Sequence, residues 1–277
     1  MVELKPMDLG EILDGAMTLY RRHFGLLLRV GVIALWLPCC LTIFVQMTGG
    51  PQQHFALYFV TAVLQYFAGL FLTAGAIRII SDSYLGQPTT VAQAISLGVN
   101  KMMPLFGVGI GKGLLLGLIA GGAGVVAAVT IPALGSSGAG GLGVAIVLIG
   151  GAVWGTIFVA CGYAVTTQVV VLEPLDGAFD SFGRSWELTK GFKWKVFFIG
   201  LIVFIILWAP IFALGFAVGL MRVSDPQTSA TLAVISALIP IVLTPLLACV
   251  FTLMYYDLRI RREGFDLQVL SQQLVSS

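Results

Sequence analysis

Charged residues are scarce in this chain. Of its 277 residues, 15 are lysine or arginine and 13 are aspartate or glutamate, so 10% of the sequence is charged, whereas an ordinary soluble domain has about 25%. So few charges cannot cover the surface of a soluble fold of this length. Hydrophobic residues make up 58% of the chain, and its mean hydropathy is +1.00. The composition excludes a soluble enzyme, a nucleic-acid-binding protein and a disordered chain, and it predicts an integral membrane protein.

The chain also lacks the sequence patterns of catalytic and metal-binding sites. Its four cysteines lie within apolar runs without a C-x-x-C spacing, and neither histidine has a ligand partner at metal-binding spacing. A G-x-S-x-G elbow, a phosphate-binding loop and a dinucleotide-binding fingerprint are all absent. We therefore expect a protein that is not an enzyme and that has no catalytic residue, no cofactor and no metal site.

Long apolar segments are abundant. A membrane-spanning helix needs about 20 mostly apolar residues, and polar or turn-rich breaks divide the chain into six segments of at least this length. They cover approximately residues 25–47, 55–80, 105–134, 142–171, 196–220 and 231–256. The sequence therefore predicts an all-α polytopic membrane protein with six transmembrane helices in a single transmembrane domain, residues 1–277.

The basic residues gather on one side of these segments. All of them except Arg222 lie before the first segment, between the second and third, between the fourth and fifth, after the sixth, or just inside those ends. The positive-inside rule places that side in the cytoplasm. We therefore expect a multi-pass protein of the plasma membrane with both termini in the cytoplasm.

The three cytoplasmic segments share a pattern, which indicates an internal repeat. Each begins at a proline (Pro6, Pro88 or Pro174), and a residue type that favours helix N-caps follows two positions later. The cap residues are Asp8, Thr90 and Asp176, and the first two complete capping boxes with Glu11 and Gln93. The repeats cover approximately residues 6–87, 88–173 and 174–267.

Each repeat is predicted to hold a short amphipathic helix followed by a transmembrane hairpin. The short helices carry an apolar stripe at helical spacing and are about half polar, so they are too weak to span. We expect them to lie along the cytoplasmic membrane interface, with their basic residues near anionic head groups. The alternative is that they pack against loops on the soluble side.

Glycines recur every four residues in the third apolar segment and so share one helix face. Small residues at this spacing let helix backbones approach closely within a membrane. We interpret them as helix-packing glycines within the chain, and a homo-oligomer interface is the alternative. The glycines are Gly109, Gly113, Gly117 and Gly121.

Two polar side chains within the apolar segments form a candidate intramembrane site. Ionisable or strongly polar residues inside a span are functional candidates by default. Lys112 lies in the third segment and Gln65 in the second. Alternatively, the Lys112 stem reaches back toward the cytoplasmic head groups, and Gln65 finds a hydrogen-bond partner in the bundle.

Three stretches of the chain resemble a bacterial membrane-protein family. Residues 9–24 (LGEILDGAMTLYRRHF) are similar to its N-terminal signature, and residues 184–196 (RSWELTKGFKWKV) and 255–267 (YYDLRIRREGFDL) resemble later parts of it. The family is the membrane domain found with some glycerophosphoryl diester phosphodiesterases and in many uncharacterised six-span relatives. In two-part members the phosphodiesterase chemistry belongs to a separate soluble barrel, so the resemblance transfers no catalytic residue. It implies an anchoring or partner-organising module of the bacterial inner membrane.

Two functions fit the sequence. The first is a non-enzymatic membrane scaffold, anchor or subunit whose cytoplasmic basic cluster contacts anionic lipid and a membrane or cytoplasmic protein partner, with no role for nucleic acid. The second is a transporter or lipid-handling protein with a cavity near Lys112. The basic cluster consists of Arg21, Arg22, Lys101, Arg184, Lys190 and Lys193.

Overall fold

The described part of the chain is helical. The computed structural model describes residues 5–48, 50, 52–135, 139–221 and 226–265, and within these ranges it contains eight α-helices and no strand. The helices are α1 (Leu9–Met47), α2 (Phe55–Tyr84), α3 (Val91–Gly135), α4 (Ala139–Gly162), α5 (Thr166–Leu172), α6 (Asp180–Thr189), α7 (Lys193–Met221) and α8 (Pro226–Glu263).

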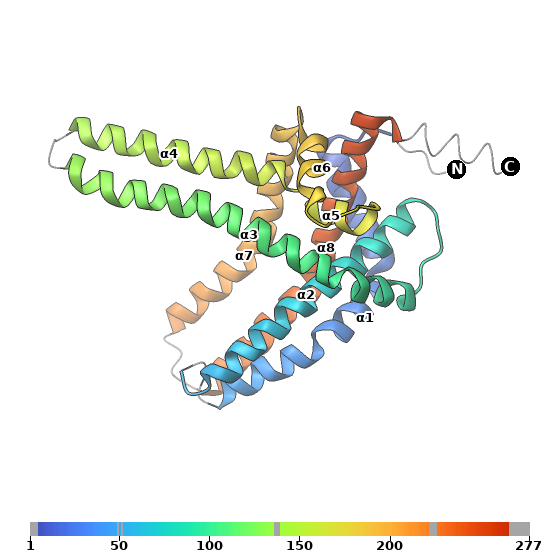
Figure 1. Cartoon of the computed structure of the whole chain (residues 1–277). Helices are drawn as coiled ribbons and strands as arrows, with labels where there is room; N and C mark the ends of the chain where they lie inside the picture. The colour runs from blue at the N-terminus through green and yellow to red at the C-terminus, as the bar shows by residue number, and fades with distance from the viewer. Residues whose placement is uncertain (1–4, 49, 51, 136–138, 222–225, 266–277) are drawn as a thin grey trace.

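The helices form two groups that meet at one end of the molecule. Helices α1, α2 and α8 pack side by side, whereas α3 and α4 form a hairpin that diverges from them (Figure 1). Helix α7 packs against both α4 and α8, and the short helices α5 and α6 lie where the two groups meet. The polar contacts described below are concentrated at this meeting point.

Large apolar side chains remain exposed along the diverging hairpin. Leu118 of α3 is 74% exposed and Val147 of α4 is 73% exposed. A soluble monomer rarely exposes so much contiguous apolar surface to water. Lipid tails can cover such a surface, provided that the backbone N–H and C=O groups are hydrogen-bonded within the protein, as they are in a helix. The fold is therefore compatible with a multi-pass membrane protein.

The number of spans agrees with the sequence to within one. Five described helices are long and apolar enough to cross a membrane, and a sixth span results if the bent pair α6–α7 is counted as one. The sequence predicts six. The difference arises at α6 and α7, whose axes meet at an angle of 104° across a short break.

Two of the three short amphipathic helices expected from the sequence are not separate helices in the structure. Residues 9–24 and 91–104 do not form separate helices, because α1 and α3 run without interruption from these segments into the apolar ones. Polarity changes there, but a change of polarity does not break backbone hydrogen bonding, and Pro104 is accommodated within α3. Of the three expected short helices, the one in the third repeat is separate and corresponds to α6. The division into three repeats stays a prediction.

The predicted caps are confirmed at two of three sites. The Asp8 N–H donates to the Glu11 carboxylate at 2.8 Å, and Thr90 and Gln93 exchange the two hydrogen bonds of a capping box. The third prediction is wrong, because α6 begins at Asp180 instead of after Asp176. The Asp180 carboxylate accepts a hydrogen bond from the Gly177 N–H and so holds the turn that precedes the helix.

Candidate functional site

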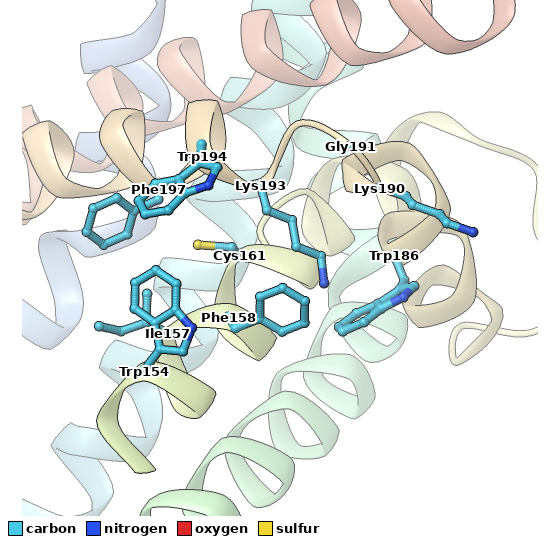
Figure 2. A pocket seen from close by; sticks show the side chains of 10 residues that line it. All are labelled: Trp154, Ile157, Phe158, Cys161, Trp186, Lys190, Gly191, Lys193, Trp194 and Phe197. Carbon is cyan, nitrogen blue, oxygen red and sulfur yellow. The ribbon is translucent and has the colours of Figure 1, made fainter. Parts of the chain in front are cut away.

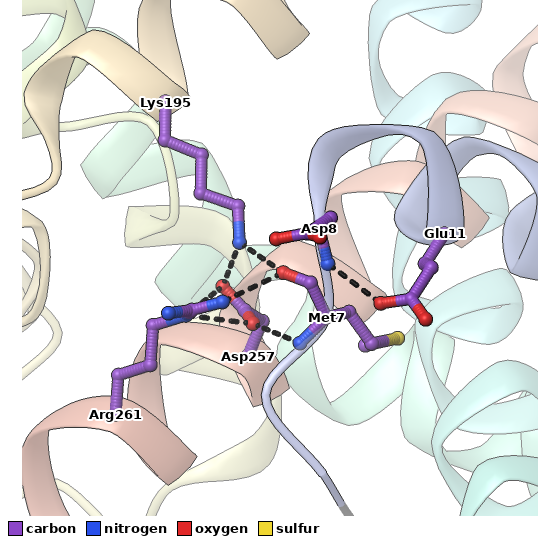
Figure 3. Close-up of polar contacts among 6 residues, drawn as sticks. All are labelled: Met7, Asp8, Glu11, Lys195, Asp257 and Arg261. Carbon is purple, nitrogen blue, oxygen red and sulfur yellow. Dashed lines mark hydrogen bonds and ion pairs between the residues drawn. The ribbon is translucent and has the colours of Figure 1, made fainter.

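A buried carboxylate joins three distant parts of the chain. Asp257 of α8 is fully buried, and it forms ion pairs with Lys195 of α7 at 2.6 Å and with Arg261 of α8 at 3.0 Å (Figure 3). It also accepts a hydrogen bond from the Met7 N–H, while the Met7 carbonyl accepts from both Lys195 and Arg261. Each charge is thus paired, as burial requires. This Asp257 cluster fixes the segment before α1 against α7 and α8.

A second ion-pair network lies between α6 and the end of α8. Arg184 pairs with Glu173 at 2.8 Å and also with Glu263, which in turn pairs with Arg259 at 3.1 Å. Tyr255 donates a hydrogen bond to Glu173 at 2.8 Å. Burial opposes the charge of Arg184, but its hydrogen bonds to the two glutamates outweigh that effect and raise its pKa above the ordinary value. The network is therefore charged and structural.

The fourth apolar segment is interrupted between α4 and α5. Residues 163–165 form turns, so carbonyl groups at the end of α4 lose their helical partners. The Lys112 ammonium donates to the Tyr163 carbonyl at 2.9 Å, and Ser185 of α6 donates to the Gly162 carbonyl at 2.9 Å. A cation at a helix C-terminus is also favoured by the helix dipole. Lys112 thus stabilises a break within the membrane-spanning region.

The other candidate intramembrane residue, Gln65, does not lie with Lys112 in a shared site. It is partly buried on α2, and no hydrogen bond joins its side chain to the described residues. A different glutamine is more constrained: the Oε1 atom of Gln168 on α5 and the Oγ1 atom of Thr252 on α8 are both buried without a partner in the described part of the chain. Such atoms are usually bound by internal water.

The residues of the predicted basic cluster have three different environments. Arg21, Arg22 and Lys190 are exposed. Lys101 donates to the Val170 carbonyl near the end of α5 at 2.8 Å, and Arg184 belongs to the network above. The sixth residue, Lys193, is half-buried among aromatic rings. Two of the six residues, Lys101 and Arg184, therefore make structural contacts. Three others are exposed to solvent or lipid head groups.

One glycine of the α3 stripe lies at close range to a described side chain of another helix. A Cβ atom built on Gly109 would lie 2.4 Å from the Tyr66 hydroxyl oxygen of α2, so this glycine permits a close approach. A Cβ atom on Gly113, Gly117 or Gly121 would meet nothing within 4 Å. The described residues therefore show a close approach at Gly109, where α3 lies against α2, and the packing role of the other three glycines stays a prediction.

A pocket lies between α4, α6 and α7. It has a volume of about 460 Å³ and is lined by Trp154, Trp186 and Trp194 together with other apolar side chains. Lys193 points into it, with its Nζ atom 3.4 Å from the ring centroids of both Phe158 and Trp186 (Figure 2). This geometry is a double cation–π contact. This aromatic pocket is not among the sites predicted from the sequence, although Trp186 and Trp194 on either side of Lys193 are a local signal for it.

A second cavity of about 450 Å³ adjoins the first one. Both are lined by Ile157, Cys161 and Phe197, and the second extends toward Lys112 and along α7. A cavity beside Lys112 was an expectation of the transporter hypothesis. However, the ammonium group is held by the Tyr163 carbonyl and the rest of the lining is apolar, so this cavity does not favour transport of a polar substrate.

The described residues form no group of three His, Cys, Asp or Glu side chains that could hold a metal ion. The four cysteines form no disulfide with one another, and Cys39, Cys161 and Cys249 are buried whereas Cys40 is exposed. Sequence reasoning missed Asp257 as a structural centre, because two of its three partners, Lys195 and Met7, are 62 and 250 residues away.

The model of a family described as a domain of unknown function, DUF7847, matches residues 7–257, which is most of the chain. No curated protein and no solved structure matches the chain. Nothing in these comparisons links it to the membrane domain of glycerophosphoryl diester phosphodiesterases, so that resemblance stays a prediction.

Proposed function

We propose that this chain, which belongs to the DUF7847 family, is a non-enzymatic scaffold, anchor or subunit for a protein partner in a bacterial plasma membrane. In this proposal both termini lie in the cytoplasm, and the end of the molecule where α5, α6 and the end of α8 meet is the cytoplasmic end. The predicted excess of basic residues on that side supports this orientation.

One observation carries the proposal. The buried carboxylates at this end are engaged in structural ion pairs, whereas Arg21, Arg22 and Lys190 are exposed and have no ion pair with a described carboxylate. The buried and ion-paired acids therefore hold the fold together, and the exposed basic groups are available to anionic head groups or to an acidic partner surface. The carboxylates tied up in this way are poor candidates for acid–base catalysis, which supports a non-enzymatic role.

Charge reversal tests this function. Arg21→Glu combined with Arg22→Glu should reduce recovery of a protein partner in a pull-down and reduce correct placement in the membrane, because both residues are exposed and their reversal removes no internal contact. Arg222→Glu, which changes the one basic residue predicted on the opposite side, is the matched control. Unchanged recovery and placement in the double variant would contradict the proposal.

A further inference from the structure

The pocket between α4, α6 and α7 has the properties of a lipid-binding site. Its body is apolar, and it opens outward, since Trp154 and Trp194 are 50% and 62% exposed at its edges. Tryptophan is enriched where a membrane protein crosses from the hydrocarbon to the head-group region. The pocket therefore lies at the level where a phospholipid changes from polar head group to acyl chain.

The charge at the pocket is positive and uncompensated. Lys190 and Lys193 line it, and no acidic residue does. Neither lysine forms an ion pair with a described carboxylate, whereas the next lysine along the chain, Lys195, is paired with Asp257. A bound anion would supply the missing counter-charge, and a phosphate accepts charge-assisted hydrogen bonds from ammonium groups.

The geometry also disfavours a cationic ligand. The aromatic surfaces of Phe158 and Trp186, which could bind a quaternary ammonium group, are already occupied by the Lys193 ammonium (Figure 2). A choline head group would meet that charge at close range. The pocket therefore discriminates in favour of an anionic head group.

The adjoining cavity provides a path for an acyl chain. It continues from Phe197 past Gly200 to Phe204, which lie on one face of α7 at helical spacing. From Lys193 to Phe204 a helix rises about 16 Å, so the groove runs from the basic end well into the apolar part of the span. A Cβ atom at Gly200 would meet nothing within 4 Å, which leaves the groove open at this point.

We propose that this pocket and groove bind one anionic phospholipid, with its phosphate at Lys193 and Lys190 and one acyl chain along α7. The lipid is a resident structural ligand that joins the α3–α4 hairpin to α7, which contact each other only loosely through protein atoms. This inference rests on the membrane placement of the proposed function and names the lipid site within it.

Native mass spectrometry of the full chain in a mild neutral detergent tests the proposal. The protein is titrated with phosphatidylglycerol and with phosphatidylcholine of the same acyl chains. A single phosphatidylglycerol should bind about tenfold more tightly than phosphatidylcholine, as expected for one charge-assisted contact. Lys193→Met and, to a smaller extent, Lys190→Gln should remove this preference.

Gly200→Leu tests the acyl groove separately. It should weaken binding of both lipids about tenfold, because its side chain would occupy the path of the acyl chain. Gly117→Leu is the matched control, since a Cβ atom there also meets nothing within 4 Å but lies outside the groove; it should leave binding unchanged. Circular dichroism and thermal unfolding should show that all four variants remain folded.

Three results would overturn the proposal. Equal binding of the two lipids would remove the head-group preference, and unaltered binding by both Lys193→Met and Gly200→Leu would remove the site. Displacement of the lipid by inorganic phosphate alone would show a site for a free anion instead. The double variant Arg21→Glu and Arg22→Glu should keep the lipid adduct, so a failure of the scaffold function and a failure of this site give different results.

Discussion

Lys112 of α3 donates a hydrogen bond to the carbonyl oxygen of Tyr163, at 2.9 Å, where α4 ends within the membrane-spanning region. Thr166 donates to the same carbonyl at 2.9 Å. A lysine in an apolar segment suggests a transport site, but here its charge satisfies a backbone group that a helix break exposes. Lys112, a candidate transport residue from the sequence, therefore has a structural role at the break after α4.

The first prediction concerns this contact. Lys112→Met should destabilise the protein by about 1–3 kcal/mol, because the Tyr163 carbonyl loses its charged donor and keeps only the neutral Thr166 hydroxyl at 2.9 Å. Thermal unfolding in detergent measures the effect. Arg22→Met, at an exposed position, is the control and should be close to neutral. A Lys112→Met variant with unchanged stability but altered solute flux in proteoliposomes would instead favour the transporter hypothesis.

The second prediction concerns the Asp257 cluster. Asp257→Asn removes the negative charge that faces Lys195 and Arg261, and breaking a buried pair in this way costs about 3–5 kcal/mol. The variant should unfold at lower temperature, and limited proteolysis should cut more readily near Met7, because that segment loses its partner. Asp14→Asn, on an exposed face of α1, provides the comparison. Equal melting temperatures for the two variants would refute the structural role of the cluster.

The third prediction concerns the packing of α6 on the end of α4. A Cβ atom at Gly162 would lie 2.2 Å from the Trp186 ring, so Gly162→Ala should destabilise the protein by about 1–3 kcal/mol through overpacking. Gly155→Ala, in the same helix but with open space at the Cβ position, should have little effect. The double variant Gly162→Ala, Trp186→Leu should recover part of the lost stability, because leucine is smaller than tryptophan and leaves room for the new Cβ atom. Failure of this rescue would show that the ring contact is not the cause.

The fourth prediction concerns the bend between α6 and α7. Gly191 has a φ of +90°, in the region that favours glycine, and it connects two helices whose axes differ by 104°. Gly191→Ala should cost about 1–2 kcal/mol in strain. Gly183→Ala within α6 should instead be neutral or stabilising by up to about 1 kcal/mol, because alanine favours a helix. The melting temperatures of the two variants should therefore move in opposite directions or differ clearly, and equal shifts would count against the strain argument.

The sequence by itself determined the class of the protein and its local signals. The shortage of charge and the apolar segments of about 20 residues predict membrane helices, because a helix satisfies its own backbone groups in lipid and needs about that length to span. The capping boxes at Asp8 and Thr90 were also readable, since each depends on residues three positions apart. These features depend on composition or near neighbours in the chain.

Only the tertiary structure decided what the distant residues do. It placed Asp257 beside Met7, set Lys112 against the break after α4, brought Gly109 close to Tyr66, and gathered three tryptophans around the pocket that holds Lys193. Each of these depends on how far α3 and α4 diverge from the other helices and on the sharp bend before α7. Helix directions follow from the packing of side chains far apart in sequence, and local patterns do not contain that information.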